Sequence, residues 1–300
     1  MTAAPGSITR DLSRIARPGG GFAMLAVDQR EAMRSMFAEH QQAPVTDEQL
    51  RDFKVAATRV LTPHASAVLV DRQFALDAVI EAGAVAPGCG LIAAADRFVP
   101  GEAVPGAYEH VMDVELDDDV DLAAYRDRGV VAAKLLVIYR PGDDPGRRRD
   151  LVRRFLERSH AAGLVSILEP VSRAPRTGAS WDWDDGVLAA ARELGGLGAD
   201  LYKAEVPLRG TGDHQEIGRR CGLLSEAVSG PWVVLSSGVP HEQFPSAVQT
   251  ACRHGASGFL AGRAVWASVI GSADVEHELA TVSVERLERL AEIVDATVNR

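Results

Sequence analysis

Eight short apolar runs recur along the chain, and this pattern constrains the fold more than any other feature. Each run is closed by polar, glycine or proline residues, as expected of strands buried on both faces. The segments between most of them have helical periodicity, for example over residues 47–61, 146–163, 183–198 and 216–230. Strands that alternate with helices predict right-handed βαβ units in a parallel sheet. The apolar runs cover residues 22–30, 65–73, 90–98, 130–140, 163–170, 199–207, 232–238 and 257–263.

Eight such units predict an α/β fold that closes into a single (β/α)8 TIM barrel spanning residues 1–300, because parallel barrels commonly reach this length as one domain. An open doubly wound sheet is the alternative, but no GxGxxG follows the first run, which disfavours a dinucleotide-binding version. Residues 7–17 predict an extra N-terminal helix that closes the barrel floor. Residues 273–298 predict a final amphipathic helix, and the acidic segment 109–121 predicts a solvated surface segment.

Charge and cysteine content exclude several classes of partner. The net charge of −10 disfavours a duplex nucleic acid but is compatible with an anionic metabolite in a locally basic site. The three cysteines are far apart and odd in number, which fits a reducing cytoplasm. Residues 1–25 lack a signal-peptide pattern, and no apolar run approaches the ~18 residues of a membrane helix. We therefore expect a cytoplasmic protein with no nucleic-acid and no membrane partner.

Polar side chains gather at the C-terminal ends of the predicted strands, whereas the opposite ends are apolar or small. Reactive groups of parallel barrels come from these C-terminal ends. The concentration therefore predicts a functional site at this mouth of the barrel. Its members are Asp28, Gln29, Arg30, Asp71, Arg72, Asp96, Arg97, Arg140, Glu169, Lys203, Glu205, Ser236, Ser237, Gly238, Gly262 and Arg263.

Two lysines, Lys134 and Lys203, lie inside apolar strands. A lysine flanked by apolar residues on a buried strand loses hydration, which disfavours its ammonium form, and a second ammonium nearby adds to this effect. A neutral amine can attack a ketone and form an imine, whose protonated form accepts electrons when a C–C bond breaks. Alternatively, each lysine only forms a salt bridge with a carboxylate at a neighbouring strand end, such as Asp28 or Glu169.

Glu169 ends the strand of residues 163–170 and shares one face with Val165 and Ile167 by strand alternation. If that face is the lumen, Glu169 points into the site. A carboxyl group there suits proton shuttling to a substrate hydroxyl and to a carbinolamine. The alternative is a purely structural partner for a lysine.

The loops after the seventh and eighth strands predict a phosphate site. Ser236, Ser237 and Gly238 follow strand seven, while Gly262 and Arg263 follow strand eight. Glycines let backbone N–H groups approach an oxyanion, serines add hydroxyl donors, and arginine gives a bidentate fork. The eight histidines show no HxH or HExxH spacing, so we expect no catalytic metal and no cofactor.

Several long motifs resemble the class I barrel-aldolase family of sulfofructosephosphate aldolase, which also includes tagatose-bisphosphate aldolase. The resemblance runs from about residue 17 to 298, and AVDQREAM and EPVSRAPRTG favour the sulfo-sugar branch. The motifs are GGFAMLAVDQREAMRSMF, ASAVLVDRQFALDAVIE, GLVSILEPVSRAPRTG, GADLYKAEVPL, WVVLSSGV and GASGFLAGRAVWASVIG.

The resemblance implies cleavage of 6-deoxy-6-sulfofructose 1-phosphate to dihydroxyacetone phosphate and sulfolactaldehyde, a step of sulfoquinovose catabolism. It implies that Lys203 forms the Schiff base, that Glu169 is the proton-transfer acid/base, and that Lys134 matches the family's strand-four lysine. Lys134 and Asp28 are expected to set charge states and orient hydroxyls. The resemblance also favours a homo-oligomer. It implies that the substrate phosphate binds at Ser236, Ser237, Gly238, Gly262 and Arg263.

Two rival functions remain open: a tagatose or fructose 1,6-bisphosphate aldolase, and a non-catalytic barrel that only binds sugar phosphates. The first differs from the sulfo-sugar enzyme at the distal substrate end, where a phosphate replaces a sulfonate. Both groups favour arginine and hydrogen-bond donors, and the sequence leaves open which side chain holds them. Candidates are Gln29, Arg30, Arg72, Arg97, Arg173 and Arg176.

Overall fold

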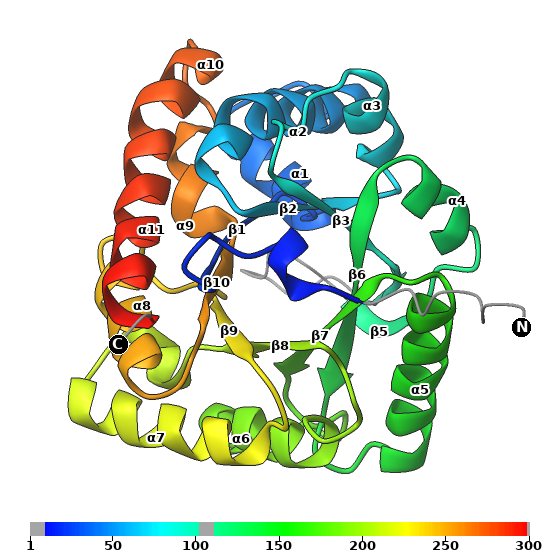
Figure 1. The fold of residues 1–300 in the computed structure, drawn as a ribbon, viewed down its shortest axis with the longest axis vertical. Coiled ribbons are helices and arrows are strands. Elements are labelled where there is room, and N and C mark those ends of the chain that lie inside the picture. Colours follow the sequence, from blue (N-terminus) through cyan, green and yellow to red (C-terminus); the bar gives the residue numbers. More distant parts are fainter. Residues whose placement is uncertain (1–9, 102–110, 299–300) are drawn as a thin grey trace, which may run out of the picture.

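The computed structural model describes residues 10–101 and 111–298. Eight parallel strands close into a barrel in the order β1-β10-β9-β8-β7-β6-β3-β2, which confirms the predicted fold (Figure 1). All eight predicted strands are present. They are β1 (Phe22–Ala26), β2 (Ala67–Asp71), β3 (Gly90–Ala94), β6 (Val130–Tyr139), β7 (Val165–Ser172), β8 (Leu201–Glu205), β9 (Trp232–Leu235) and β10 (Gly258–Ala261).

Helices between the strands form an outer layer around the barrel (Figure 1). The helix that links β1 and β2 begins where Thr46 accepts a hydrogen bond from the amide of Gln49, a typical N-cap. The longer helices are α1 (Glu31–Ala38), α2 (Asp47–Leu61), α5 (Pro145–Ala161), α6 (Trp183–Leu194), α7 (His214–Ala227), α8 (Phe244–Arg253) and α11 (Val284–Val298). The shorter ones are α3 (Leu76–Glu81), α4 (Leu122–Asp127), α9 (Arg263–Trp266) and α10 (Val275–Glu278).

Strand alternation divides the apolar residues into two cores. One fills the lumen and includes Met24, Ile167 and Leu201. The other lies between the barrel and the helices and includes Leu25 and Leu168, the next residues along two of the same strands. Because successive side chains point to opposite faces, a polar residue two positions beyond a lumen residue also faces the lumen. This rule positions the side chains at the mouth of the barrel.

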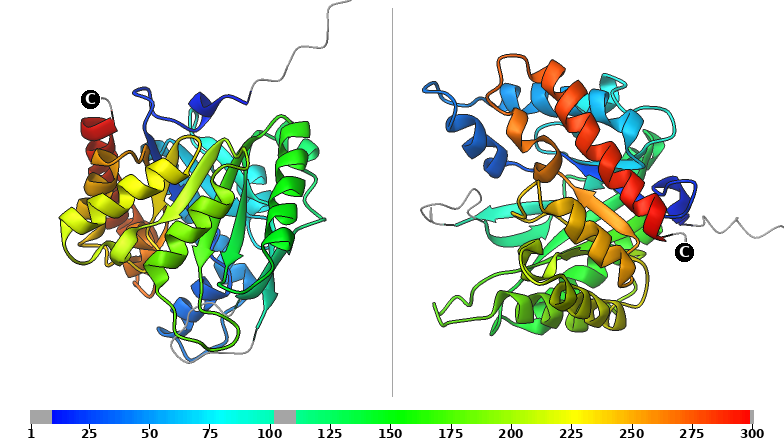
Figure 2. Two further views of the ribbon diagram at one scale, coloured as in Figure 1. Left: turned by 90° about the horizontal axis from the view of Figure 1, so that it is seen from below. Right: turned by 90° about the vertical axis from the view of Figure 1, so that its left-hand side faces the viewer.

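The N-terminal end of the barrel is closed by a short segment. Leu12–Arg14 form a single 3-10 turn, and the fully buried Ile15 packs among the lumen residues. Gly90 is required here because a Cβ would lie 2.4 Å from the backbone oxygen of Arg14. Figure 2 shows this turn at the end opposite the antiparallel hairpin of β4 (Asp96–Pro100) and β5 (Val111–Leu116). The expected floor closure is confirmed, but a helix over 7–17 is wrong for the described part, and residues 7–9 lie outside it.

The final helix expected over residues 273–298 is confirmed, with one irregularity. Helix α10 passes through a π-helical turn at Leu279–Ser283 directly into α11. α11 packs against α8 and β1, so it covers the junction at which the first and last strands of the barrel pair.

An antiparallel hairpin corrects two expectations. The run at 90–98 divides between β3 and β4 (Asp96–Pro100), which pairs with β5 (Val111–Leu116). β3 ends because the Asp96 side chain, not the backbone, accepts the amide of Leu136 at 2.9 Å. The segment predicted as solvated surface therefore contains a strand whose Val114 and Leu116 are buried, while its residues 109 and 110 lie outside the described part.

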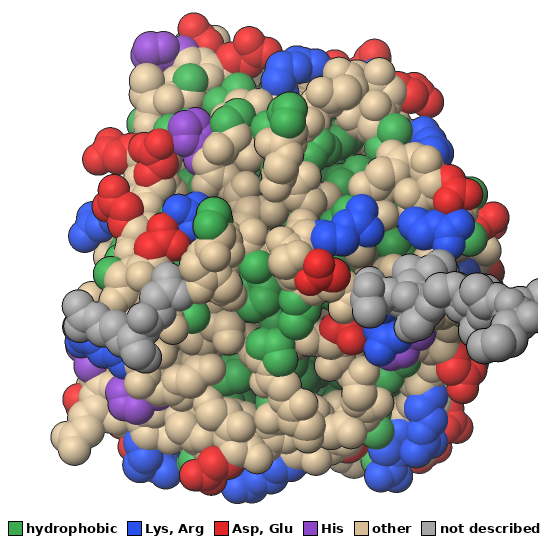
Figure 3. All heavy atoms as spheres, in the orientation of Figure 1, with side chains coloured by type: hydrophobic (Ala, Val, Ile, Leu, Met, Phe, Trp, Pro, Cys, Tyr) green, Lys and Arg blue, Asp and Glu red, His purple; other side chains and the backbone are tan. Residues whose placement is uncertain are grey.

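On the face seen in Figure 3, which is the floor end of the barrel, acidic and basic side chains alternate around the rim and apolar atoms gather near the centre.

Cys89, Cys221 and Cys252 are free thiols. Burial raises the pKa of each thiol to about 12. Within residues 10–101 and 111–298, no helix has the length and apolar character that a membrane crossing requires.

Candidate active site

A pocket opens at the C-terminal ends of the strands, on the side of the barrel opposite Ile15. Phe98 of the hairpin and Leu136 of β6 form part of its apolar wall. Nine of the residues singled out in the sequence line it, from β7 and β8 and from the segments after β1, β7, β9 and β10. They are Asp28, Gln29, Glu169, Arg173, Lys203, Ser236, Ser237, Gly262 and Arg263.

Lys203 lies in the lumen beside a single carboxylate. It is two residues beyond Leu201 on β8, and its side chain lines the pocket with only 3% of the residue exposed. Its Nζ atom lies 2.9 Å from Oε1 of Glu169, which lies on the lumen face of the adjacent strand β7. The Lys203 amine and the Glu169 carboxylate are thus close enough for direct proton transfer, and both line the pocket.

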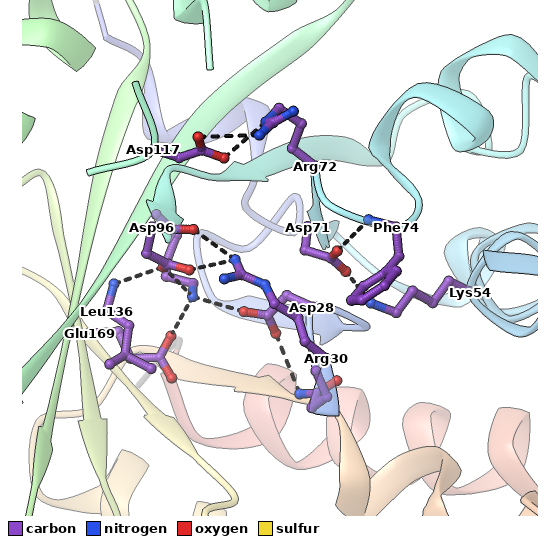
Figure 4. A network of polar contacts seen from close by, with 12 residues as sticks. Asp28, Arg30, Lys54, Asp71, Arg72, Phe74, Asp96, Asp117, Leu136 and Glu169 are labelled. Atoms are coloured by element: carbon purple, nitrogen blue, oxygen red, sulfur yellow. Dashed lines mark hydrogen bonds and ion pairs between the residues drawn. The ribbon is translucent and has the colours of Figure 1, made fainter. Parts of the chain in front are cut away.

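Lys134 is completely buried and is enclosed by three carboxylates; these belong to Asp28, Asp96 and Glu169, which Figure 4 labels. Its Nζ lies 2.8 Å from Asp28, 2.8 Å from Asp96 and 3.4 Å from Glu169. Burial alone would lower the pKa of Lys134, but these carboxylates outweigh it and hold the pKa well above its usual value. Lys134 is therefore a fixed ammonium, which separates it from Lys203.

The pKa of Asp28 responds to the same contacts. Burial would raise it, but Lys134 and then Lys203 outweigh burial and lower it, so Asp28 is held as a carboxylate. The mutual stabilisation of Asp28 and Lys134 fixes both charges at the base of the pocket.

The three carboxylates of Asp28, Asp96 and Glu169 form a cage around Lys134, and Arg30 holds the Asp96 member in place. The guanidinium of Arg30 donates to the Asp96 carboxylate at 2.7 Å and to its backbone oxygen at 2.9 Å, and it stacks 4.1 Å from the Phe98 ring centroid. Arg30 is 4% exposed and lies outside the pocket lining, so the structure does not bring this expected substrate ligand to the pocket. Sequence reasoning noted Asp96 at a strand end but missed that it belongs to the cage.

Asp71, a member of the site predicted from the sequence, does not line the pocket. Its carboxylate pairs with the fully buried Lys54 of α2 and accepts the amide of Phe74 at 2.9 Å (Figure 4). Asp71 is completely buried because the α2 lysine reaches it from the helical layer. One signal was available: the chain has only three lysines, Lys54, Lys134 and Lys203, and all three are buried against carboxylates.

The loops after β9 and β10 have the backbone expected of an anion cradle. Ser237 and Gly238 adopt φ values of +27° and +84°. A Cβ at Gly262 would lie 2.4 Å from the backbone oxygen of Ala26, so only glycine fits there. Arg263 forms no ion pair with any described residue, and its side chain lines the pocket. Gly238 lies behind Ser237, outside the pocket lining.

Glu205 and Arg173 were both singled out in the sequence, Glu205 at a strand end and Arg173 as a candidate for the distal substrate end, and the structure brings them together. Glu205 is 1% exposed; it accepts the Ser172 amide at 2.6 Å and the Ser237 hydroxyl at 2.9 Å. Arg173 lies 3.4 Å from the same carboxylate and lines the pocket. Burial raises the pKa of Glu205 even though Arg173 opposes the shift. This carboxylate connects the loop after β7 to the serine loop after β9.

No group of three or more histidine, cysteine or acidic side chains among the described residues has an arrangement that could hold a metal ion. The polar side chains that line the pocket are instead one amine, two carboxylates, two guanidinium groups, one amide and two hydroxyls, from Lys203, Glu169, Asp28, Arg173, Arg263, Gln29, Ser236 and Ser237. Such a set can transfer protons, bind anions and present a nucleophilic amine to a carbonyl.

Comparison with solved structures agrees with the barrel. A structure of fructose-bisphosphate aldolase from Plasmodium falciparum aligns with a TM-score of 0.71 at 14% identity, over 99% of this chain and 97% of that one. An archaeal fructose-1,6-bisphosphate aldolase aligns with a TM-score of 0.62 at 16% identity, over 96% and 99% of the two chains. At these identities the likeness establishes the fold alone.

Sequence comparison identifies the family. A tagatose 1,6-diphosphate aldolase of Listeria monocytogenes (serotype 4a, strain HCC23) is 29% identical over 286 residues, which cover 86% of this chain and 81% of the relative. Tagatose 1,6-diphosphate aldolase 1 of Enterococcus faecalis (strain ATCC 700802 / V583) is 27% identical over 281 residues, with 86% and 83% covered. The DeoC/LacD aldolase family model matches residues 22–268. The chain therefore belongs to the DeoC/LacD family of aldolases, enzymes that cleave carbon–carbon bonds.

Proposed function

We propose that this aldolase is a class I enzyme that forms a Schiff base between Lys203 and the ketone of a phosphorylated ketose, without a metal. The observation that carries the proposal is the Lys203–Glu169 pair at 2.9 Å in the pocket. A solved archaeal aldolase with this fold carries its catalytic lysine covalently bound to a carbinolamine intermediate, which supports the same chemistry here.

The first steps require a neutral amine. Glu169 takes a proton from the Lys203 ammonium, and the amine then adds to C2 of the ketose to give a carbinolamine. Glu169 returns the proton to the departing hydroxyl, so water leaves and a protonated imine forms. The fixed charge of Lys134, 3.4 Å from Glu169, stabilises the carboxylate form of Glu169 that is present before the first transfer and restored by the second.

The carbon–carbon bond then breaks between C3 and C4. Glu169 or a phosphate oxygen of the substrate accepts the proton of the C4 hydroxyl, the bond electrons move into the protonated imine, and an aldehyde leaves. The remaining enamine takes a proton at C3, and hydrolysis frees dihydroxyacetone phosphate and Lys203. Asp28, held as a carboxylate by Lys134, is suited to orient substrate hydroxyls.

The substrate phosphate is proposed to bind at Ser236, Ser237, Gly238, Gly262 and Arg263. The positive φ values of Ser237 and Gly238 support this assignment, because such turns can direct successive backbone N–H groups toward an oxyanion. Ser236, Ser237, Gly262 and Arg263 also line the pocket together. Arg263 supplies a positive charge that is not neutralised by a described carboxylate.

For the substrate we propose 6-deoxy-6-sulfofructose 1-phosphate, cleaved to dihydroxyacetone phosphate and sulfolactaldehyde. The motifs AVDQREAM and EPVSRAPRTG support this choice. A second candidate is tagatose or fructose 1,6-bisphosphate, which is supported by the names of the Listeria and Enterococcus relatives.

Release of dihydroxyacetone phosphate, coupled to its NADH-dependent reduction, tests the proposal with the three ketoses side by side. We expect the highest kcat/KM with the sulfo-sugar and no loss of rate in EDTA. A clear preference for a bisphosphate would replace the first substrate by the second. Tight binding of all three without turnover would contradict both and leave a sugar-phosphate-binding barrel.

A further inference from the structure

The pocket contains a second arginine, Arg173, whose charge is only weakly engaged. Its Nη1 atom donates to the backbone oxygen of Ser172 at 2.8 Å and lies 3.4 Å from Oε1 of Glu205. The side chain is 44% exposed, and it lines the pocket together with Lys203. One long contact to a carboxylate is much weaker than the bidentate pairing that a guanidinium can make.

The other arginines considered for the distal substrate end are committed elsewhere. Arg30 is buried against Asp96, and none of the remaining three lines this pocket. Arg72 pairs with Asp117 and Asp119, Arg97 pairs with Glu115, and Arg176 pairs with Asp143 and Asp113 beside a cavity outside the barrel.

Strand order places the two available guanidinium groups on opposite flanks of Lys203. Arg263 follows β10 and Arg173 ends the extended segment of β7, while Lys203 lies on β8 between them in the order β10-β9-β8-β7. A ketose joined to Lys203 through C2, with its C1 phosphate at Arg263, extends its C6 end toward the β7 side. Resting on the proposed aldolase function, we propose that Arg173 recognises the anionic group at C6 and thereby selects doubly anionic ketoses.

Recognition of the C6 anion requires Arg173 to turn away from Glu205, and the other contacts of Glu205 keep the free-energy cost of this turn small. Its carboxylate already accepts the Ser172 amide and the Ser237 hydroxyl, so it keeps two donors when Arg173 turns away. Arg173 then exchanges one 3.4 Å contact for a bidentate pair with a sulfonate or phosphate. In the absence of substrate, Glu205 holds the arginine at the pocket wall and Ser237 in its left-handed conformation.

The test compares ketoses that differ only at C6. We would measure kcat/KM for fructose 1,6-bisphosphate, 6-deoxy-6-sulfofructose 1-phosphate and fructose 1-phosphate in the wild type and in Arg173→Met, Arg173→Lys and Arg176→Met. Arg173→Met should lower the ratio of doubly to singly anionic substrate by roughly 10- to 100-fold, mainly through KM, with partial recovery in Arg173→Lys. Arg176→Met, on the same loop but outside the pocket, should keep the ratio within about twofold.

An equal loss on all three substrates would make Arg173 a structural residue, and an unchanged ratio would remove it from recognition; either result overturns the proposal. Borohydride trapping of Lys203 with each of the three ketoses separates this proposal from the aldolase chemistry. If the wild type gives neither adduct nor turnover with any of them, the proposed function fails. Calorimetric binding of the same three ketoses to wild type and Arg173→Met would then still decide whether Arg173 senses the C6 charge.

Discussion

Lys134 and Lys203 look alike in the sequence, but the barrel surrounds them differently. Both interrupt apolar strands, and both face the lumen. Lys134 is completely buried among three carboxylates, whereas Lys203 has one carboxylate partner and borders the pocket. Burial alone disfavours the ammonium of Lys134, but its three neighbouring carboxylates outweigh burial and hold it charged. The comparison teaches that a lysine on a buried strand is a candidate nucleophile only where a substrate can reach it.

The largest expected effect is at Lys203. Lys203→Met should lower kcat by about 10⁴-fold or more, because no other amine lines the pocket in the described residues. Folding should persist, since Glu169 keeps Lys134 as a partner. Steady-state rates with circular dichroism as a folding control check this. Retained turnover in a folded variant would contradict the division of roles.

Lys134→Met should show a smaller loss of rate with a larger loss of stability. We expect kcat to fall by roughly 10²–10³-fold, because Glu169 loses the neighbouring charge that supports its proton transfers. The free energy of unfolding should fall by about 3–5 kcal/mol because three buried carboxylates lose their cation. Urea denaturation and steady-state rates measure the two effects.

Lys54→Met is the matched control, since Lys54 pairs with Asp71 outside the pocket. It should destabilise by a similar ~3–5 kcal/mol while kcat per folded molecule stays within about threefold of the wild type. If Lys134→Met also kept its kcat, Lys134 would be a structural cation like Lys54, and the comparison between the strand lysines would need revision.

The smallest expected effect is on acid stability. The pKa of Asp28 is lowered in the fold because Lys134 and Lys203 outweigh burial. The stability that it contributes is therefore present above its ordinary pKa of 3.8 and is lost as pH falls below that value. Asp28→Asn should flatten the decline of unfolding free energy as the pH falls below about 4, by at most about 1.4 kcal/mol per pH unit. If the unfolding free energies of the wild type and Asp28→Asn fell in the same way at acid pH, Asp28 would contribute nothing to this pH dependence.

The barrel and much of the pocket could be predicted because they follow from repeating local patterns. Alternation of apolar runs with amphipathic helices determines the topology, and it also puts Lys203 and Glu169 on the lumen side. The β4–β5 hairpin could not be predicted this way. Its acidic residues 113 and 115 suggested a solvated segment, and the buried alternate positions, Val114 and Leu116, were too few to outweigh them.

Pairing across distant segments was the other feature that local patterns could not reveal. Asp71 ends a strand exactly as Asp28 does in the sequence, yet Lys54 reaches it from α2 and removes it from the pocket. Arg30 is similarly withdrawn by Asp96. In both cases the partner lies 17 or more residues away in the chain, and its reach depends on helix and hairpin packing that the local pattern does not encode.

Reductive trapping followed by peptide mapping tests the division between the two lysines most directly. Wild-type enzyme mixed with the sulfo-sugar phosphate, or with dihydroxyacetone phosphate, and then treated with borohydride should gain one covalent adduct on the peptide that contains Lys203. Lys134 should remain unmodified, and Lys203→Met should gain no adduct. An adduct on Lys134, or none on either lysine while the enzyme turns over, would contradict the account.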